Sequence, residues 1–133
     1  MLLIDEIRQK IYEHGTLINA PLNLLNVPDK ATSDGTPYIE VVGDVYNYVI
    51  SERGLERYRD ETKEINDLLH WFFSDITSTM SFDYELKHRI PNQDCRRLIF
   101  KHKLELLKQL DHDWYEKEIQ KIKSILEKSP YQD

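Results

Sequence analysis

The stretch YIEVVGDVYNYVI, residues 38–50, predicts β structure and therefore an α+β fold instead of an all-helical one. β-Branched and aromatic residues fill both halves, and the Gly43-Asp44 pair between them is typical of a two-residue type II′ hairpin turn. That turn predicts a register in which Val41 pairs with Tyr46, so that one face of the hairpin is apolar. Because an isolated hairpin is only marginally stable in water, we expect this face to pack on helices.

Apolar residues at helical spacing predict helices on both sides of this hairpin. The expected ranges are 4–14, most of 60–87, about 93–110 and about 114–128. The sequence therefore predicts an α+β fold that is mainly helical, with three to four helices packed together and a β-hairpin or small antiparallel sheet near residues 38–50.

Residues that favour helix ends set these boundaries. Gly15 suits the position just after the first helix, and Asn92 is a candidate cap for the third. Asp113 with Glu116 matches a capping box at the start of the last helix. The Thr-Ser-Thr run near 77–81 allows a kink or break in the second helix. The connection at 16–37 is long for a loop, so we expect it to be either well packed or functional.

Length and composition are typical of one soluble folded domain. The chain has 133 residues, 40% of them hydrophobic, and we expect residues 1–133 to form a single domain. No apolar run approaches the roughly 20 residues that span a bilayer. The N-terminus MLLIDEIRQK lacks the basic region of a signal peptide, and a single cysteine excludes an internal disulfide framework. We therefore expect a cytoplasmic protein without a membrane partner.

Charge is distributed unevenly along the chain. Residues 1–90 carry 16 acidic and 9 basic residues, a net −7, whereas residues 91–133 carry 8 acidic and 9 basic residues, a net +1. An acidic surface repels nucleic acid and favours a basic protein partner by steering the encounter. Ordinary solubility explains the same charge equally well.

Cys95, the only cysteine, lies among charged residues in HRIPNQDCRRLIF, residues 88–100. Cys95 and His102 would be separated by roughly 10 Å along one helix, too far to share a zinc ion. The histidines form no H-x-x-x-H pair, and the four scattered glycines form no phosphate-binding loop. We expect a buried, inert Cys95, no catalytic residue, no metal and no cofactor.

A helix over 93–110 would carry two apolar stripes, and Arg96 would lie between them. A partly buried arginine needs a carboxylate partner, and Asp75 and Glu85 on the preceding helix are the candidates. These three residues are the predicted structural polar frame. The basic residues beyond position 96 alternate with acidic ones and have no aromatic stacking platform, so we expect a solvated helical face and no direct nucleic acid contact.

The region from 49 to about 131 resembles the immunity protein 63 family of bacterial polymorphic-toxin and contact-dependent growth inhibition systems. The resemblance rests on VISERGLE (49–56), DLLHWFFSDIT (67–77), YELKHRIPNQDCRRLIF (84–100), LELLKQLDHDWYEKE (104–118) and SPYQD (129–133). It implies an inhibitor that is not an enzyme and that binds the toxic domain delivered by a sibling cell, blocking its active site or substrate access. A generic acidic protein-interaction or regulatory module without a toxin partner is the alternative, and an enzyme or RNA-binding protein is the third possibility.

Physical reasoning places the contact surface in the acidic part of the chain. Toxins of this kind are often basic nucleases, so an acidic surface offers complementarity and fast association. The predicted partner-binding residues are six acids with one apolar anchor: Asp29, Asp34, Glu40, Asp44, Glu52, Glu56 and the anchor Tyr38.

Overall fold

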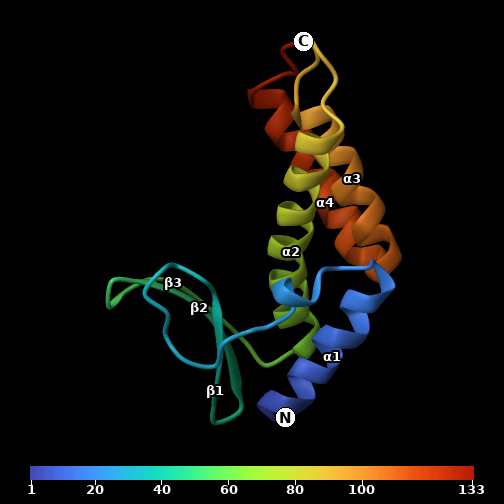
Figure 1. Cartoon of the computed structure of the whole chain (residues 1–133). Helices are drawn as coiled ribbons and strands as arrows, with labels where there is room; N and C mark the ends of the chain where they lie inside the picture. The colour runs from blue at the N-terminus through green and yellow to red at the C-terminus, as the bar shows by residue number, and fades with distance from the viewer. The chain divides into compact units, whose positions relative to one another are not determined.

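The computed structural model describes residues 1–133 and shows an α+β fold, as predicted (Figure 1). The helices are α1 (Ile4–Leu17), a short 3₁₀ helix η1 (Leu22–Leu24), α2 (Ile65–Lys87), α3 (Arg96–Leu110) and α4 (His112–Lys128). The strands are β1 (Tyr38–Val42), β2 (Val45–Glu52) and β3 (Leu55–Thr62).

The chain forms two compact units, Met1–Phe72 and Phe73–Asp133. The first contains α1, η1, the three strands and the start of α2; the second contains the rest of α2 with α3 and α4. Each unit has its own buried apolar residues. The expectation of a single domain over 1–133 stays a prediction.

The three strands form one antiparallel sheet in the order β1-β2-β3. The predicted hairpin register is confirmed, because Val41 pairs with Tyr46 and Ile39 with Tyr48. Gly43 in the turn has a φ of 61°, a left-handed value that glycine adopts without strain. Two hairpins in succession therefore build the sheet, the first of them encoded by the stretch 38–50.

The prediction of a helix over most of 60–87 is wrong at its start. Residues Leu55–Thr62 form strand β3, and helix α2 begins only at Ile65. Most of β3 is exposed, so its sequence LERYRDET lacks the alternation of buried and exposed residues that reveals a strand. Charged residues on an exposed edge strand also discourage pairing with other chains.

Helix α1 extends to Leu17, three residues beyond the predicted end. Gly15 lies inside the helix and is buried, so its predicted position after the helix end is wrong. A Cβ atom on Gly15 would lie 3.1 Å from Leu25 Cγ and closer still to both Leu25 methyl groups. Gly15 thus allows the loop that follows to pack against α1, and the buried residues Ile18 and Val27 show that this loop is well packed.

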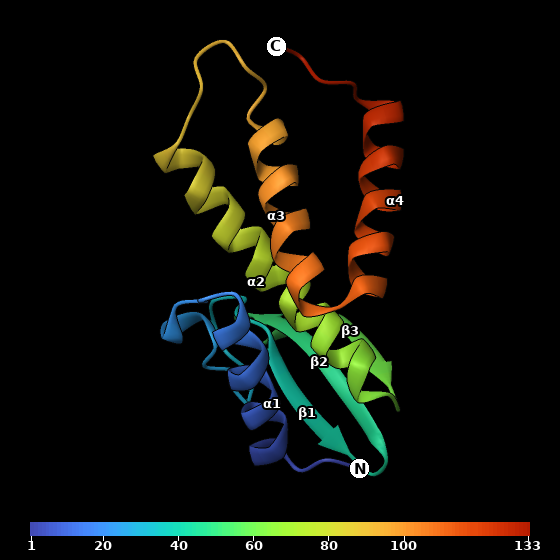
Figure 2. The same cartoon turned by 90° about the vertical axis from the view of Figure 1, so that its right-hand side faces the viewer.

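The second unit is helical, and α3 and α4 run antiparallel beside each other, joined at Asp111 (Figure 2). Phe73 of α2 stacks against Trp114 of α4, with ring centroids 6.3 Å apart. Buried leucines of α3, Leu106 and Leu107, complete this apolar core. The predicted possibility of a break near 77–81 is not realised, because α2 is continuous from Ile65 to Lys87. Thr77 Oγ1 donates a hydrogen bond to the Phe73 carbonyl within the helix.

Helix starts in this unit differ from the predictions. Asn92 does not cap a helix over 93–110; it has a left-handed φ of 64°, and α3 begins at Arg96 after the N-cap residue Cys95. Asp111, rather than Asp113 with Glu116, caps α4 by accepting hydrogen bonds from the backbone N–H groups of Asp113 and Trp114. Cys95 is exposed, so the prediction of a buried cysteine is wrong as well.

Candidate partner-binding surface

All seven predicted partner-binding residues lie in the first unit, but the fold distributes them over the sheet instead of gathering them. Asp44 lies in the β1–β2 turn, where its carboxylate is 3.1 Å from Lys63 Nζ. Asp34 forms an isolated β-bridge with Glu52 at the opposite end of β2. At about 3.3 Å per residue, the eight-residue strand Val45–Glu52 holds these two groups of acids more than 20 Å apart.

Arg59 of β3 organises the middle of the sheet and was not among the predicted residues. Its Nε and Nη2 atoms donate to the Glu56 carboxylate, with a shortest distance of 2.7 Å. Its Nη1 atom donates to Glu40 Oε1 at 3.2 Å and to Asn47 Oδ1 at 2.9 Å. One guanidinium thus fixes two of the predicted acids and a buried amide on the same face of the sheet.

This face of the sheet is hollowed beside Arg59. A shallow depression of about 350 Å³ is lined by six residues of the three strands. They are Glu40, Val42, Val45, Asn47, Arg59 and Glu61. Only Glu40 among them was predicted as a contact, so the structure defines a more local candidate site than the sequence did.

Ion pairing and hydrogen bonding keep several of these acids ionised. Hydrogen bonds from Arg59 hold the pKa of Glu56 below its ordinary value. The contact with Lys63 lowers the pKa of Asp44, and the hydrogen bond from the Thr36 backbone N–H does the same for the pKa of Asp34. These carboxylates remain negative well below neutral pH, which maintains the acidic field that the sequence indicates.

Two other predicted contact residues are less available for contact with a partner protein. Tyr38 is buried, with 7% of its surface exposed, so it is left out of the surface proposed below. Asp29 is exposed, and its carboxylate lies 3.9 Å from Arg8 Nη2. Asp34, Glu52 and Glu61 are exposed acids for which no ion pair within the chain is found.

Sequence reasoning missed Arg59 and Glu61 because it predicted no strand over 55–62, and it did not single out Val42 within the predicted hairpin. A weak signal was present: Gly54 before the exposed strand Leu55–Thr62 favours a turn, and the strand contains Tyr58 and ends in the β-branched Thr62. Once β3 is paired with β2, Asn47 lies opposite Glu61 and Val49 opposite Arg59. The register, which the sequence did not reveal, brings these residues together.

The predicted polar frame lies in the second unit and is built differently from the prediction. Arg96 contacts a carboxylate, but that carboxylate belongs to Asp94, whose Oδ2 atom is 2.8 Å from Arg96 Nη2. Glu85 is buried and accepts hydrogen bonds from Arg89, one turn further along. Asp75 is exposed, and its charge acts on Lys103 of α3. The expected pairing of Arg96 with Asp75 or Glu85 is wrong. Because α3 starts three residues later than predicted, Asp94 lies outside the helix, and its carboxylate pairs with the Arg96 side chain.

Asp94, Arg96 and Arg97 hold the end of the chain. Arg96 donates to the carbonyl oxygens of Ser129 and Pro130 at 2.8 and 2.9 Å. The Tyr131 ring lies 4.0 Å from the Arg97 guanidinium carbon, and Asp133 pairs with Arg97 at 2.8 Å. We call this set of contacts, between 94–97 and 129–133, the tail clasp. The tail clasp gives Asp94, Arg96 and Arg97 of HRIPNQDCRRLIF a structural role.

A second polar cluster is buried between the helices of this unit. Lys103 Nζ donates to Ser78 Oγ at 2.7 Å and to Ser74 Oγ at 3.3 Å, and it lies 3.7 Å from Glu118. Burial lowers the pKa of Lys103, while the carboxylate of Glu118 opposes this shift. The ammonium group acts as donor to both hydroxyls, which suits a satisfied buried charge.

Two further searches of the structure concern metals and membranes. No group of three or more His, Cys, Asp or Glu side chains is placed to hold a metal ion. No helix is both long enough and apolar enough to cross a bilayer.

Comparison with known proteins gives one match. The family described as immunity protein 63 matches residues 43–124, a range that begins at the β1–β2 turn and ends within α4. No curated protein and no solved structure matches the chain. The matched range contains Arg59, Glu61 and the arginines of the tail clasp, and it covers more than half of the sequence. The chain therefore belongs to the immunity protein 63 family.

Proposed function

We propose that this chain is an immunity protein that binds and neutralises a cognate bacterial toxin domain. The observation that carries the proposal is the family match over residues 43–124. The proposed mechanism is steric: the bound chain occludes the active site of the toxin or the path of its substrate. It acts by binding alone, in the cytoplasm of the cell that it protects, without touching nucleic acid itself.

The charge of the first unit supports a basic toxin. Residues 1–90 carry a net −7, and several of their carboxylates are held ionised by neighbouring donors. A nuclease must be basic where it binds a phosphate backbone, and an acidic inhibitor complements that surface and associates rapidly. We therefore propose a toxin of nuclease type, delivered by a polymorphic-toxin or contact-dependent growth inhibition system.

We propose that the contact surface lies on the sheet of the first unit. It comprises the predicted acids that remain accessible there, Asp34, Glu40, Asp44, Glu52 and Glu56, with Asp29 nearby. Charge reversal at Asp34 and Asp44 together tests this placement at both ends of β2. We expect weaker toxin binding with a smaller dependence on salt, and an unchanged affinity would exclude this surface.

Co-expression with the toxin domain encoded beside this gene tests the function itself. We expect the chain to co-purify with that domain and to restore growth of cells that produce it. An active toxin that is neither bound nor neutralised would contradict the proposal. A chain that binds another acidic-surface partner but not the toxin would instead be the interaction module considered as the alternative.

A further inference from the structure

The depression beside Arg59 has both an acidic and an apolar wall. Glu40 and Glu61 are on its polar side, and Val42 and Val45 are on its apolar side. We propose that this depression receives a lysine or arginine side chain of the toxin, an inference that rests on the function proposed above.

Arg59 does not make the depression a site for anions. Its Nε and Nη2 atoms are directed at Glu56, and its Nη1 atom is shared by Glu40 and Asn47. An incoming phosphate or carboxylate would have to displace one of these acceptors and would then face the carboxylates of Glu40, Glu56 and Glu61. With three acids around one base, this face carries an excess of negative charge.

Glu61 is the carboxylate best placed to hold an incoming cation. Its side chain is exposed at the depression and makes no hydrogen bond or ion pair within the chain. Glu40 accepts a single hydrogen bond from Arg59, which leaves its other carboxylate oxygen available. A guanidinium or ammonium group between Glu40 and Glu61 would therefore gain two charged acceptors without breaking a contact of Arg59.

Val42 explains why a long basic side chain fits better than a small ion. It is 55% exposed on the edge strand β1, and Val45 lies opposite it in the register. Lysine and arginine side chains cover such apolar surface with their methylene stems while their charged ends reach polar groups. The two valines and the two carboxylates thus match the two parts of one side chain.

The test compares two variants that remove one wall each. Glu61→Lys reverses the charge, and Val42→Thr removes the apolar contact while keeping a β-branched side chain of the same size. Glu127→Lys is the matched control, because Glu127 is an exposed acid of α4 without an ion pair. Circular dichroism first establishes that all three variants fold, and titration calorimetry then measures their affinity for the toxin domain encoded beside this gene.

We expect Glu61→Lys to weaken toxin binding by about a hundredfold and Val42→Thr by about tenfold, with Glu127→Lys within about threefold of wild type. Wild-type affinity in both depression variants would overturn the inference while leaving the proposed function intact. Equal losses in Glu61→Lys and Glu127→Lys would also overturn it, because net charge alone would then explain binding. A wild-type chain that fails to bind the toxin would contradict the proposed function itself.

Discussion

Asp94 and Arg96, two residues apart, form an ion pair of 2.8 Å just before and at the start of α3. The same Asp94 carboxylate accepts hydrogen bonds from the backbone N–H groups of Arg96 and Gln132. One carboxylate therefore orients the arginine, caps the first turn of α3 and fixes the end of the chain. This arrangement makes Asp94 the residue on which the tail clasp depends.

Asp94→Asn should release the tail while leaving the helices folded. The amide retains the size of the side chain but loses the charge that orients Arg96. We expect the backbone amide of Gln132, which donates to the Asp94 carboxylate, to lose protection in hydrogen exchange by about tenfold or more, whereas the amides of α4 are unchanged. Asp113→Asn, at an exposed carboxylate of α4, is the control. A tail that stays protected in Asp94→Asn would show that Arg97 and Asp133 suffice to hold it.

The tail clasp should also open on acidification. Hydrogen bonds from Arg96, together with those of the backbone, hold the pKa of Asp94 below its ordinary value of 3.8. A carboxyl whose pKa is lowered by folding stabilises the folded form fully above the ordinary value, and this contribution disappears as the pH falls through the lowered pKa. We expect the amide resonances of Tyr131, Gln132 and Asp133 to be constant from neutral pH down to about pH 4 and to shift only below it. A shift centred near neutral pH would contradict this assignment.

Lys103 and Glu118 offer a test of the buried polar cluster. Replacing Lys103 by Met leaves the Glu118 carboxylate buried without its cation, and we expect a loss of about 3 kcal/mol in the free energy of unfolding. The double variant Lys103→Met/Glu118→Leu should recover most of this loss, because the uncompensated charge is gone. Lys101→Met, at an exposed position of the same helix, should change stability by less than about 0.5 kcal/mol. Chemical denaturation measures the free energy of unfolding of all three variants. A double variant less stable than Lys103→Met would show that Lys103 and Glu118 are not energetically coupled.

The sequence predicts the parts of the fold whose side chains alternate between a buried and an exposed side. The hairpin of β1 and β2 has such a pattern, and its turn residues fix the register of Val41 with Tyr46. Strand β3 has no such pattern because most of its side chains are exposed. The start of α3 was misplaced because Asn92 is a plausible cap in the sequence. In the structure Asp94 lies before the helix, where it contacts Arg96 and residues 129–133, and the helix starts only after Cys95.

The sequence predicted the charge of the candidate site but not its position in the fold. The acidic bias of residues 1–90 is a property of composition, so the sequence reveals it directly. The depression at Glu61 depends on the β2–β3 register, in which Asn47 lies opposite Glu61. The spacing of residues within one strand does not reveal which residue of the neighbouring strand lies opposite. For Tyr38 the sequence was misleading. Its apolar ring suggested an anchor for the partner protein, but the side chain is buried in the fold.

Gly15→Ala should destabilise the chain although alanine favours helices. The new methyl group would press against the Leu25 side chain, which is buried and cannot move freely. Overpacking of this kind exceeds the gain in helix propensity, and we expect a net loss of about 1 kcal/mol in the free energy of unfolding. In a Leu25→Ala background the same substitution should become neutral or stabilising, because the space is then free. Thr16→Ala, at the exposed neighbouring position, is the control, and a loss that persists without Leu25 would contradict the steric explanation.

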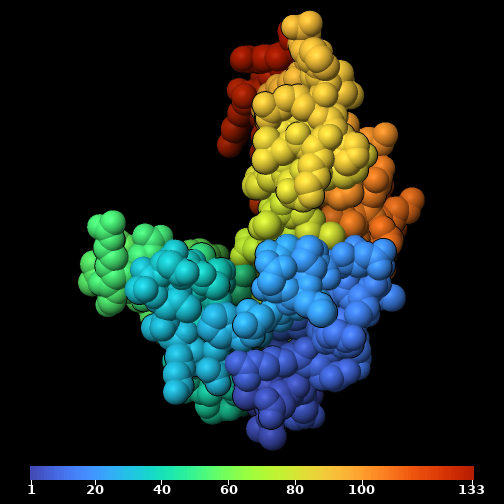
Figure 3. Space-filling view, viewed as in Figure 1, coloured from blue at the N-terminus to red at the C-terminus, as the bar shows by residue number.

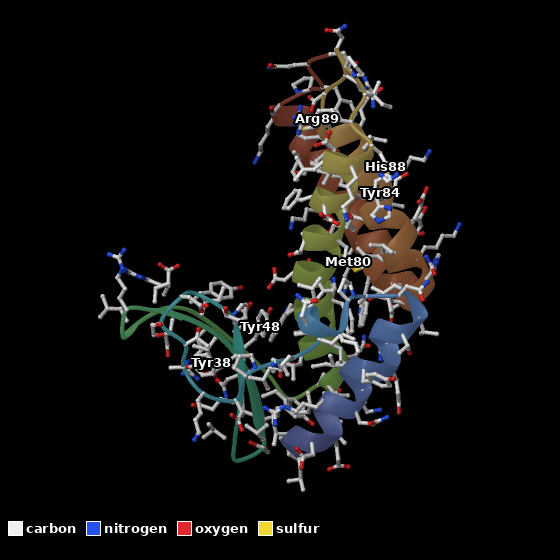
Figure 4. The ribbon with its side chains drawn as sticks, viewed as in Figure 1. Tyr38, Tyr48, Met80, Tyr84, His88 and Arg89 are labelled. Atoms are coloured by element: carbon white, nitrogen blue, oxygen red, sulfur yellow. The ribbon has the colours of Figure 1, made fainter.

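His102 should make the second unit sensitive to mild acid. The Tyr84 ring stacks on the rings of both His88 and His102, each at a centroid distance of 4.1 Å. Figure 4 shows Tyr84 and His88 side by side on α2. Burial, together with the charge of His88, lowers the pKa of His102 below its ordinary value of 6.5, although Glu105 acts in the opposite direction. Neutral His102 is thus the form that the folded unit favours.

The sign of the expected pH dependence follows from this lowered pKa. A group with a lowered pKa stabilises the folded state above its ordinary value of 6.5, and the stabilisation disappears as the pH falls through the lowered pKa. The stack packs one side of α2, whereas Phe82 and Leu86 on its other side are 54% and 66% exposed. Residues around 80–90, yellow in Figure 3, form open surface on the face shown. Protonation of His102 should therefore loosen the packing on one side of α2, whose other side is exposed to solvent.

We expect the thermal midpoint to fall by about 2 °C between pH 7.5 and pH 5.5. His102→Phe keeps an aromatic ring against Tyr84 but cannot be protonated, so its midpoint should be nearly constant over the same range. His112→Gln, at an exposed histidine of α4, should retain the wild-type slope. Differential scanning calorimetry of the three proteins at matched ionic strength measures these slopes. A slope that persists in His102→Phe would assign the pH dependence to another group, because the substituted ring no longer titrates.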